Sequence, residues 1–261
     1  MAKISESHPR RDSLLTRQKL VDAAERGLLA ESAMIAHGRG EAYDYLLGEQ
    51  TTESSLLAIR EVVARLRAAA RPVISVNGNT VVLAGENLIR VAAVIQCPIE
   101  VNLYYRSPER VAGLLSLLSK QREEVRNKGA PEGYTGDWFD AVGSVRLMGA
   151  EEDGRIEGLL GPRSICSAEG IGSADTVLIP LEDGDRCEAL IDLGKEVLVI
   201  DLNPLSRTSM MASVTIVDEV ARASEALVRE TITGQSGPTQ WDNQRVLRDA
   251  LDTMAGALER V

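Results

Sequence analysis

The chain has 261 residues, a hydrophobic content of 44% and a formal net charge of −10. This length is enough for one large α/β domain or two small ones. The negative charge argues against nucleic-acid and anionic-membrane partners, since both require clustered Lys and Arg. No apolar run approaches the ~20 residues of a transmembrane helix, and residues 1–11 lack a signal peptide's apolar core. We expect a soluble, cytoplasmic protein.

The cysteines and histidines are too few and too scattered for a zinc site or a disulfide framework. Cys97, Cys166 and Cys187 form no CxxC pair, and His8 and His37 lie far from them in the sequence. We therefore predict no metal held by the protein alone. Any metal is expected to be Mg²⁺, held mainly through substrate phosphates.

The first third of the chain predicts helices. Apolar side chains recur every three or four positions from Ser13, a suitable N-cap, to Leu29. A short helix is expected within 41–49. The segment "TTESSLLAIREVVARLRAAA" is strongly amphipathic, with Thr51 or Thr52 as its N-cap.

From residue 72 the pattern changes to alternating strands and helices. Strands are expected within 72–79, 98–105, 174–181, 195–203 and 212–220, and helices within 84–96, 107–125, 186–194, 218–231 and 241–261. Ser107 and Asp185 are the expected N-caps of two of these helices. Strands that are apolar almost throughout indicate a mainly parallel sheet with helices on both faces, an α/β fold.

Residues 127–172 are rich in glycine and acids and show no sustained period, which predicts loops around a site. No linker or repeat divides the rest. We predict one domain over 1–261, made of a helical N-terminal segment (1–70), an α/β core (71–225) and a C-terminal loop and helix (226–261).

Polar clusters follow four of the predicted strands. They lie at 76–79, 102–107, 181–186 and 201–208. Parallel sheets bind ligands beyond the carboxyl ends of their strands, where helix N-termini offer unpaired N–H groups to anions. The clusters therefore predict a crevice suited to phosphate or to a nucleotide.

Asp201 is a candidate ribose ligand within this crevice. An acid just beyond an apolar strand accepts hydrogen bonds from ribose hydroxyls in dinucleotide folds. An Asx turn or a helix cap is the alternative. Asn203, Ser206 and Arg207 follow closely and could reach a base, a phosphate or a second turn.

No glycine signature identifies a cofactor. GxGxxG is absent after the first strand and GxxxxGK[ST] is absent from the chain, which disfavours a dinucleotide oxidoreductase and a P-loop kinase. The "NGNT" at 77–80 either forms a simple turn or grips a carboxylate or phosphate through its amides and asparagines.

Two arginines in the N-terminal third are candidate phosphate ligands. Gly38 and Gly40 flank Arg39, so the backbone can pack closely there and present the guanidinium. Arg17 lies within the first predicted helix, where a solvated helix face is the alternative. Charge-assisted bonds from arginine to phosphate contribute roughly 1.5–3 kcal/mol each.

Taken together, these motifs resemble a known family. The blocks "IAHGRGEAYDYLLGE", "SVNGNT", "VLIPLEDGDR" and "VIDLNPLSRTS" occur in the order found in archaeal phosphopantothenate synthetases, the 4-phosphopantoate–β-alanine ligases. The resemblance implies a Rossmann-like fold, a homodimer and a role in coenzyme A biosynthesis. It also implies that ATP is consumed, with release of AMP and pyrophosphate.

The resemblance also implies a set of ATP contacts. They carry over to Arg17, Arg39, Glu182, Asp183, Gly184, Arg186, Cys187, Asp201, Leu202, Asn203, Pro204 and Ser206. Arg17 and Arg39 would hold the triphosphate and act in catalysis. The family often has a hydroxyl-bearing residue where Cys187 stands, and a backbone contact would survive that change.

Such a ligase needs positioning and charge neutralisation rather than an enzymic nucleophile, which suits a site rich in Arg, Asn and backbone amides. From position alone, Asn77, Asn79 and Arg163 are hypothesised to bind the carboxylate or phosphate of phosphopantoate. Two alternatives stay open. One is a non-catalytic regulator that binds adenine nucleotides, and the other is an α/β transferase or oxidoreductase using the same crevice.

Overall fold

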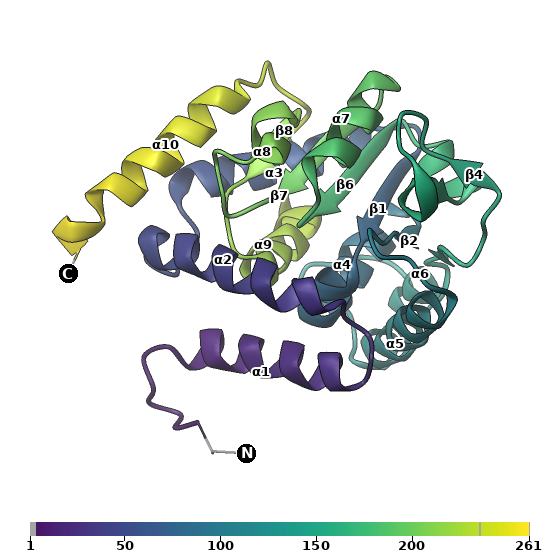
Figure 1. The fold of residues 1–261 in the computed structure, drawn as a ribbon, viewed down its shortest axis with the longest axis horizontal. Helices are drawn as coiled ribbons and strands as arrows, with labels where there is room; N and C mark the ends of the chain where they lie inside the picture. The colour runs from purple at the N-terminus through teal and green to yellow at the C-terminus, as the bar shows by residue number, and fades with distance from the viewer. Residues whose placement is uncertain (1–3, 235, 261) are drawn as a thin grey trace.

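In residues 4–234 and 236–260, which this computed structural model describes, six parallel strands form the central sheet (Figure 1). The strands are β1 (Pro72–Val76), β2 (Ile99–Val101), β3 (Leu147–Met148), β6 (Thr176–Pro180), β7 (Glu196–Ile200) and β8 (Val214–Ile216). Their order is β3-β2-β1-β6-β7-β8, so the chain builds outward from β1 in one direction and then from β6 in the other. This is the doubly wound order of Rossmann-like folds, and it confirms the predicted fold class.

Both faces of the sheet are buried. Ile74 and Val76 of β1 pack into a core on one face, while Val73 of the same strand packs into a second core on the opposite face. The same alternation runs through β6 and β7. Strands buried on both sides are apolar at most positions, which is why their sequence shows no regular polar alternation.

Helices cover each face in turn. The first face carries α3 (Glu53–Ala68), α4 (Gly78–Ile95), α5 (Pro108–Asn127) and α9 (Val220–Thr233), and the second carries α7 (Gly184–Asp192) and α8 (Arg207–Met211). The C-terminal helix α10 (Asn243–Ala255) packs along β8, α3 and α2 and is followed by a 3₁₀ turn, η3 (Gly256–Arg260). The last residue of the predicted C-terminal helix, Val261, lies outside the described residues.

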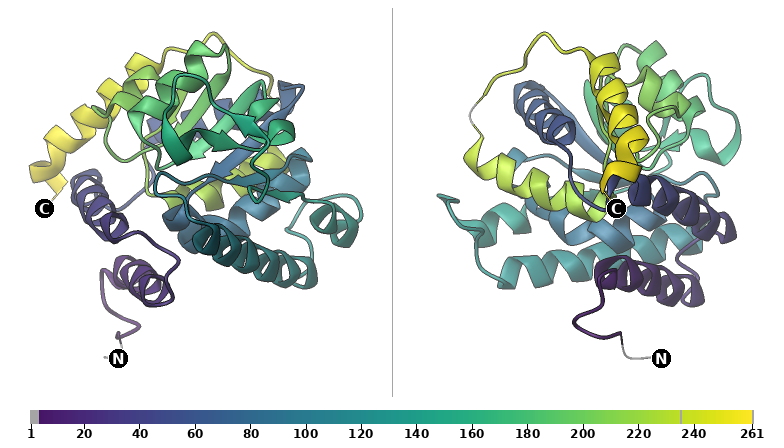
Figure 2. Two further views of the ribbon diagram at one scale, coloured as in Figure 1. Left: turned by 45° about the vertical axis from the view of Figure 1, so that its right-hand side comes forward. Right: turned by 90° about the vertical axis from the view of Figure 1, so that its left-hand side faces the viewer.

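The N-terminal helices are longer or begin earlier than predicted. The first, α1 (Arg11–Glu25), takes Arg10 as its N-cap, so the prediction of Ser13 as the cap was wrong. The second, α2 (Glu31–Leu47), is one continuous helix rather than a short one within 41–49. Figure 2 shows α2 between α1 and the C-terminal helix α10 in both views. Gly40 of this helix lies beside the loop after β7, and a Cβ there would be 3.4 Å from the Leu202 side chain.

Two core helices start earlier than their apolar periodicity indicated. The first, α4, begins at Gly78 with Asn77 as its N-cap, so the "NGNT" segment opens a helix. The second, α7, begins at Gly184 and is capped by Asp183, which makes the prediction of Asp185 as the cap wrong. The predicted caps Thr52 and Ser107 are confirmed, since each accepts a backbone N–H three residues on.

The segment 127–172 holds more structure than the predicted loops. It contains α6 (Trp138–Gly143), the edge strand β3, and a small antiparallel pair, β4 (Gly154–Arg155) with β5 (Ile165–Cys166). Two irregular helical turns, η1 (Gly161–Ser164) and η2 (Ala168–Gly172), flank β5. These pieces are two to six residues long, too short to show a hydrophobic period.

Among the described residues, α4 is long and apolar enough to cross a membrane by length and composition alone. Its position explains its composition: 61% of it is buried, and it packs between α9 and α5 over the sheet. A helix covered on most sides by protein is apolar for that reason.

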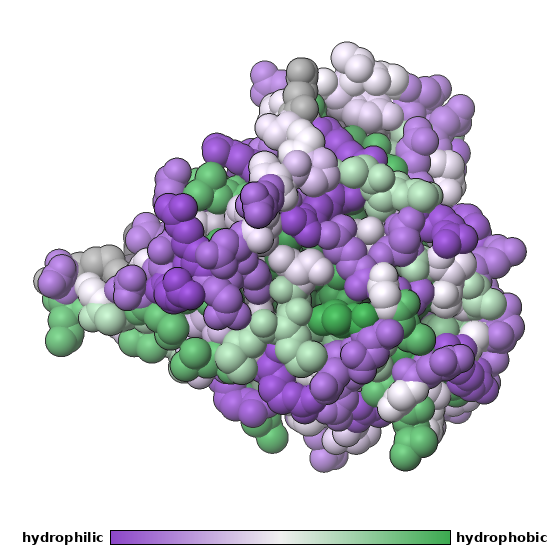
Figure 3. All heavy atoms as spheres, turned by 90° about the horizontal axis from the view of Figure 1, so that it is seen from above, coloured by the Kyte–Doolittle hydropathy of each residue, from purple (hydrophilic) through white to green (hydrophobic). Residues whose placement is uncertain are grey.

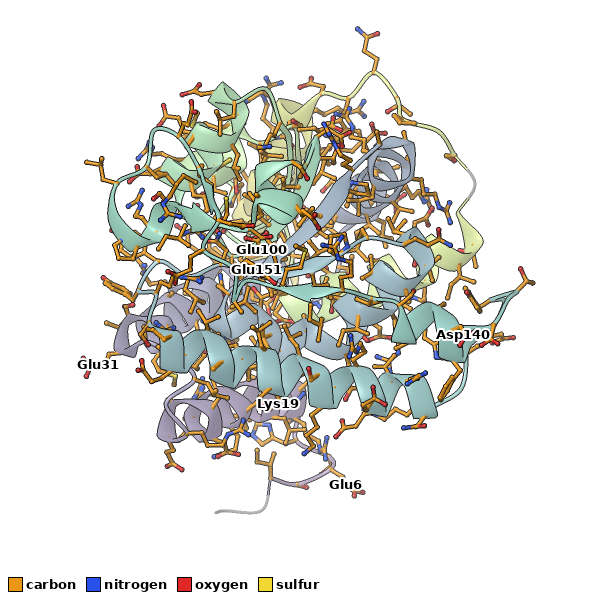
Figure 4. All side chains as sticks on the ribbon, turned by 90° about the vertical axis from the view of Figure 1, so that its right-hand side faces the viewer. Glu6, Lys19, Glu31, Glu100, Asp140 and Glu151 are labelled. Atoms are coloured by element: carbon orange, nitrogen blue, oxygen red, sulfur yellow. The ribbon has the colours of Figure 1, made fainter. Side chains whose placement is uncertain are left out.

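Glu100 is a fully buried carboxylate at the centre of β2. Its two oxygens accept hydrogen bonds from the backbone amides of Ser167 (2.9 Å) and Ile171 (2.7 Å), which fixes the irregular turn η2 against the sheet. Figure 4 shows Glu151 beside it. Burial raises the pKa of Glu100 to about 7, although the two amides oppose the shift.

This burial predicts a stability term that depends on pH. Because the pKa of Glu100 rises from 4.5 to about 7 on folding, the native state binds the proton more tightly than the unfolded chain. Ionisation of Glu100 therefore lowers the free energy of unfolding between pH 4.5 and 7, by about 3 kcal/mol in total. Denaturant unfolding would measure the free energy of unfolding of wild type and Glu100→Gln across this pH range. As the pH rises, the difference between the two free energies should shift by that amount in favour of the variant.

The amide introduced by Glu100→Gln would leave one of the two backbone N–H groups without its acceptor, a constant cost that does not alter the slope of the difference with pH. Glu132→Gln, at an exposed position, is the matched control and should give a flat difference. Parallel profiles for wild type and Glu100→Gln would contradict the prediction.

Candidate functional site

A cavity of about 1040 Å³ lies between the N-terminal helices and the carboxyl ends of the strands. Its walls are α1, α2, the first turns of α4 and α9, and the loops that follow β2 and β6. Since β1 and β6 are neighbours whose following helices leave to opposite faces, the cavity opens at the point where doubly wound sheets bind their ligands.

Asn77 holds the two halves of the sheet together at this point. Its Oδ1 accepts the Thr80 amide (3.1 Å), which caps α4, and its Nδ2 donates to the Leu181 carbonyl (2.8 Å) beyond β6. The polar atoms of this side chain therefore all have partners within the protein. What Asn77 can offer a ligand is the correct placement of the α4 N-terminus.

Asn79, two residues further along, has an unused acceptor. The side chain is 8% exposed and lines the cavity. Its Nδ2 donates to the Ala33 carbonyl (3.1 Å), while its Oδ1 is buried without a hydrogen-bond partner. A ligand with a donor group would complete this side chain.

The start of α7 forms the opposite wall. Asp183 caps the helix through Oδ1, and its Oδ2 is buried without a partner. Beneath it, Glu182 and the fully buried Arg186 form an ion pair (2.9 Å). Burial raises the pKa of Glu182, and Arg186 opposes the shift. The amides of Gly184 and Asp185 occupy the first two helical positions, which have no intrahelical acceptor.

The loop after β7 is held by its own side chains. Asp201 accepts the Asn203 amide (2.9 Å) and the Ser206 hydroxyl (2.6 Å), and Ser206 caps α8. Burial raises the pKa of Asp201. One carboxylate oxygen therefore already forms the Asx turn that was the alternative to ribose binding, and the other is taken by Ser206.

Arg39 and Arg17 differ in whether the guanidinium is free to bind a phosphate. Arg39 is exposed on the cavity wall, and within the described chain no hydrogen bond or ion pair engages its guanidinium. Arg17 instead donates to Glu41 (2.6 Å) and is not among the lining residues. A phosphate would have to share Arg17 with that carboxylate.

Glu41 joins α1 to α2. It also accepts hydrogen bonds from Ser13 (2.8 Å) and Arg10 (3.2 Å). Burial raises the pKa of Glu41, but the bonds from Ser13 and Arg17 outweigh it and bring the pKa below its usual value.

Arg163 does not line the cavity and is already engaged by partners within the protein. It pairs with Asp185 (2.9 Å) and Asp183 (3.6 Å) and stacks over Tyr104, with 4.8 Å to the ring centroid. It lines a separate, smaller hollow beside α7.

The structure thus brings together part of the predicted set. The predicted residues that line the cavity are Arg39, Asn77, Asn79, Glu182, Asp183, Arg186 and Leu202, and those that do not are Arg17, Arg163, Gly184, Cys187, Asp201, Asn203, Pro204 and Ser206. Cys187 is fully buried, its thiol contacts the Thr208 carbonyl, and burial raises its pKa to about 12. Only its backbone could serve a ligand.

Sequence reasoning gave no role to two residues of the wall, Arg110 and His37. Arg110 is half-buried and His37 has a buried Nε2 without a partner, with its pKa lowered by burial. For Arg110 the only signal was its place in the first turn of the helix after β2. Over 4–234 and 236–260, no group of three or more His, Cys, Asp or Glu side chains could hold a metal ion.

Comparison with known proteins gives the family. A model of the phosphopantothenate/pantothenate synthetase family matches residues 54–257. The chain belongs to this family. It is 40% identical over 259 residues to the 4-phosphopantoate–β-alanine ligase of Thermococcus onnurineus, with 96% of this chain and 92% of that protein covered. The ligase of the same name from Methanospirillum hungatei is 45% identical over 227 residues, covering 87% and 84%.

In this synthetase-family chain the match begins at α3, so the family model covers the sheet but not α1 and α2. Those two helices nevertheless form one wall of the cavity. A third relative, the 4-phosphopantoate–β-alanine ligase of Thermococcus kodakarensis, is 39% identical over all of this chain and 95% of its own length. The N-terminal helices are therefore part of what the relatives share.

The Glu41 contacts predict how α1 is attached. Glu41→Gln should weaken the pairs with Arg10 and Arg17 and cost about 1 kcal/mol, because these are partly exposed ion pairs. Amide hydrogen exchange should become faster in α1 while α3 and α9 are unchanged. Glu31→Gln, whose side chain points away from the fold (Figure 4), is the control. Equal exchange in α1 for all three proteins would refute this role.

Proposed function

We propose that this chain is an ATP-dependent ligase that joins 4-phosphopantoate to β-alanine, forming 4′-phosphopantothenate for coenzyme A biosynthesis. The observation that carries the proposal is a cavity at the switch point of the sheet, with unpaired cationic side chains, in a chain whose relatives are named 4-phosphopantoate–β-alanine ligases.

The proposed reaction has two steps. A carboxylate oxygen of phosphopantoate attacks the α-phosphorus of ATP, forming an acyl adenylate and displacing pyrophosphate. The amine of β-alanine then attacks the acyl carbon, expelling AMP and losing a proton. Both steps depend on holding anions together and neutralising their charge, which cationic side chains and helix amides do.

ATP is proposed to occupy the β6–β7 side of the cavity. Arg39 lines the cavity, has no competing carboxylate and would bind the triphosphate. The α7 amides at Gly184 and Asp185 directly follow the wall residue Asp183 and would serve the nucleotide only from beyond the lining. The free Oδ2 of Asp183 suits a hydrogen bond from a ribose hydroxyl or the adenine amino group. Arg17 would join after releasing Glu41.

The loop 201–206 would contact the nucleotide mainly through its backbone and Leu202, which is the member of this loop on the cavity wall. Asp201 would bind ribose only by exchanging one of its two internal hydrogen bonds. Mg²⁺ would be carried by the phosphates and supply charge neutralisation as pyrophosphate leaves.

Phosphopantoate is proposed to lie at the start of α4, against Asn79 and the amides that Asn77 positions. The hypothesis that Arg163 contacts this substrate stays a prediction, and its pairs with Asp183 and Asp185 would have to open for it.

We also propose a homodimer. Large apolar side chains on the surface suit such an interface: Ile35 on α2 is 65% exposed and Leu258 in η3 is 89% exposed. Figure 3 shows apolar side chains on the projecting C-terminal end of the chain. The single domain and the cytoplasmic location remain predictions.

A product assay tests the proposed function. The protein would receive ATP, Mg²⁺ and 4-phosphopantoate, with and without β-alanine. AMP and pyrophosphate formed only with both organic substrates would support the ligase. ADP would point to an acyl phosphate or a kinase. ATP binding without turnover would support the regulator instead.

Arg39→Ala should raise the KM for ATP or lower kcat by about 10- to 100-fold, because it removes a charge-assisted phosphate contact. Its stability should change by less than about 0.5 kcal/mol, since the side chain is exposed. Steady-state kinetics and thermal unfolding check both points. Arg60→Ala, at an exposed position on α3, should leave the kinetics intact, and unchanged kinetics in Arg39→Ala would remove Arg39 from the site.

A further inference from the structure

Arg110 is a cation on the cavity wall without a counter-ion. The side chain, in the first turn of α5, is half-buried, and no ion pair with any described residue engages it. By contrast, the buried Arg186 and the half-buried Arg65 each pair with a glutamate. Burial of an unpaired cation costs free energy, and it lowers the pKa of Arg110.

The guanidinium is nevertheless fixed in place. One terminal nitrogen, Nη1, donates to the Tyr105 carbonyl, and Nε is buried without any acceptor. The other terminal nitrogen, Nη2, would lie 3.8 Å from a Cβ on Gly78, so it faces the first turn of α4. Nη2 of Arg110 is therefore a free donor directed at a helix N-terminus, where the backbone amides of Gly78 and Asn79 have no intrahelical acceptor.

A second observation marks the same place as a ligand site. Asn79, the second residue of α4, is only 8% exposed, and its Oδ1 is buried on the cavity wall without a donor. Cationic donors, helix amides and an acceptor together suit an organic anion that also carries a hydroxyl group.

We propose that Arg110 and the N-terminal turn of α4 bind the phosphate monoester of the acid substrate, and that the Oδ1 of Asn79 accepts a hydrogen bond from its hydroxyl group. The proposal rests on the proposed function and specifies how the acid is recognised. The site lies on the β1–β2 side of the switch point, across the cavity from the β6–β7 side proposed for ATP.

Arg110 is better placed for this role than Arg163, the cation hypothesised from sequence position. A phosphate at Arg163 would compete with the carboxylates of Asp183 and Asp185. At Arg110 it would meet no acidic side chain bonded to the guanidinium, and it would offset the cost of the buried charge.

Binding titrations test the proposal directly. Calorimetry would measure the affinities of wild type and Arg110→Met for 4-phosphopantoate, pantoate and ATP. We expect the variant to bind 4-phosphopantoate about 10- to 100-fold more weakly, since one or two charge-assisted bonds are lost. Its affinities for pantoate, which lacks the phosphate, and for ATP should stay within about twofold of wild type.

Arg122→Met is the matched control. Arg122 lies on the same helix, has intermediate exposure like Arg110, and donates to the Val145 carbonyl (2.8 Å) rather than lining the cavity. It should bind all three ligands as wild type does. Asn79→Leu should weaken the binding of 4-phosphopantoate and of pantoate to the same extent, because both ligands carry the hydroxyl group. Should Arg110→Met fail to fold, Arg110→Lys keeps the charge without the planar fork and should give a smaller loss, again for 4-phosphopantoate alone.

Three outcomes would overturn the proposal. The first is that wild type binds 4-phosphopantoate and pantoate with equal affinity. The second is that Arg110→Met loses affinity for ATP alone. The third is that Arg122→Met loses as much affinity for 4-phosphopantoate as Arg110→Met does. The proposed function can fail separately: if the product assay shows no ligation but Arg110→Met selectively loses 4-phosphopantoate, the phosphate site stands and the ligase does not.

Discussion

The adjacency of β1 and β6 is the constraint on which the rest of the structure depends. From this pair, the chain builds one half of the sheet through β2 and β3 and the other through β7 and β8. The loops after the two strands diverge and leave a crevice, which the hydrogen bond from Asn77 to the Leu181 carbonyl spans at its base. The proposed ATP contacts lie on the β6–β7 side of this crevice, and the proposed phosphopantoate contacts lie on the β1–β2 side.

The distribution of cations gives the crevice its chemistry. In a chain with a net charge of −10, most buried or half-buried arginines are neutralised by nearby acids, as Arg186 is by Glu182 and Arg222 by Asp44 and Asp218. Such pairs hold elements together and leave little charge for a ligand. Arg39 and Arg110 lack these partners and lie on the cavity wall, so each leaves a cation available to a ligand even though acidic side chains outnumber basic ones in the lining.

The N-terminal helices complete the cavity by packing rather than by extending the sheet. Glu41 ties α1 to α2 through Ser13, Arg10 and Arg17. At Gly40, α2 lies against Leu202 of the loop after β7. The same contacts bear on function, because the carboxylate that secures α1 also occupies Arg17, a predicted phosphate ligand.

The sequence by itself determined the α/β class, the parallel core strands, the amphipathic helix after Thr52 and the family motifs, because these depend on local periodicity and on residue identity. It did not reveal β3, whose two residues are too short to carry a period, or the continuity of α2 across Gly38 and Gly40. Only the tertiary structure decided which polar residues are free. Asp201 is held by its own loop and Arg163 is paired with Asp185, whereas Arg110 has no acidic partner and keeps Nε without an acceptor.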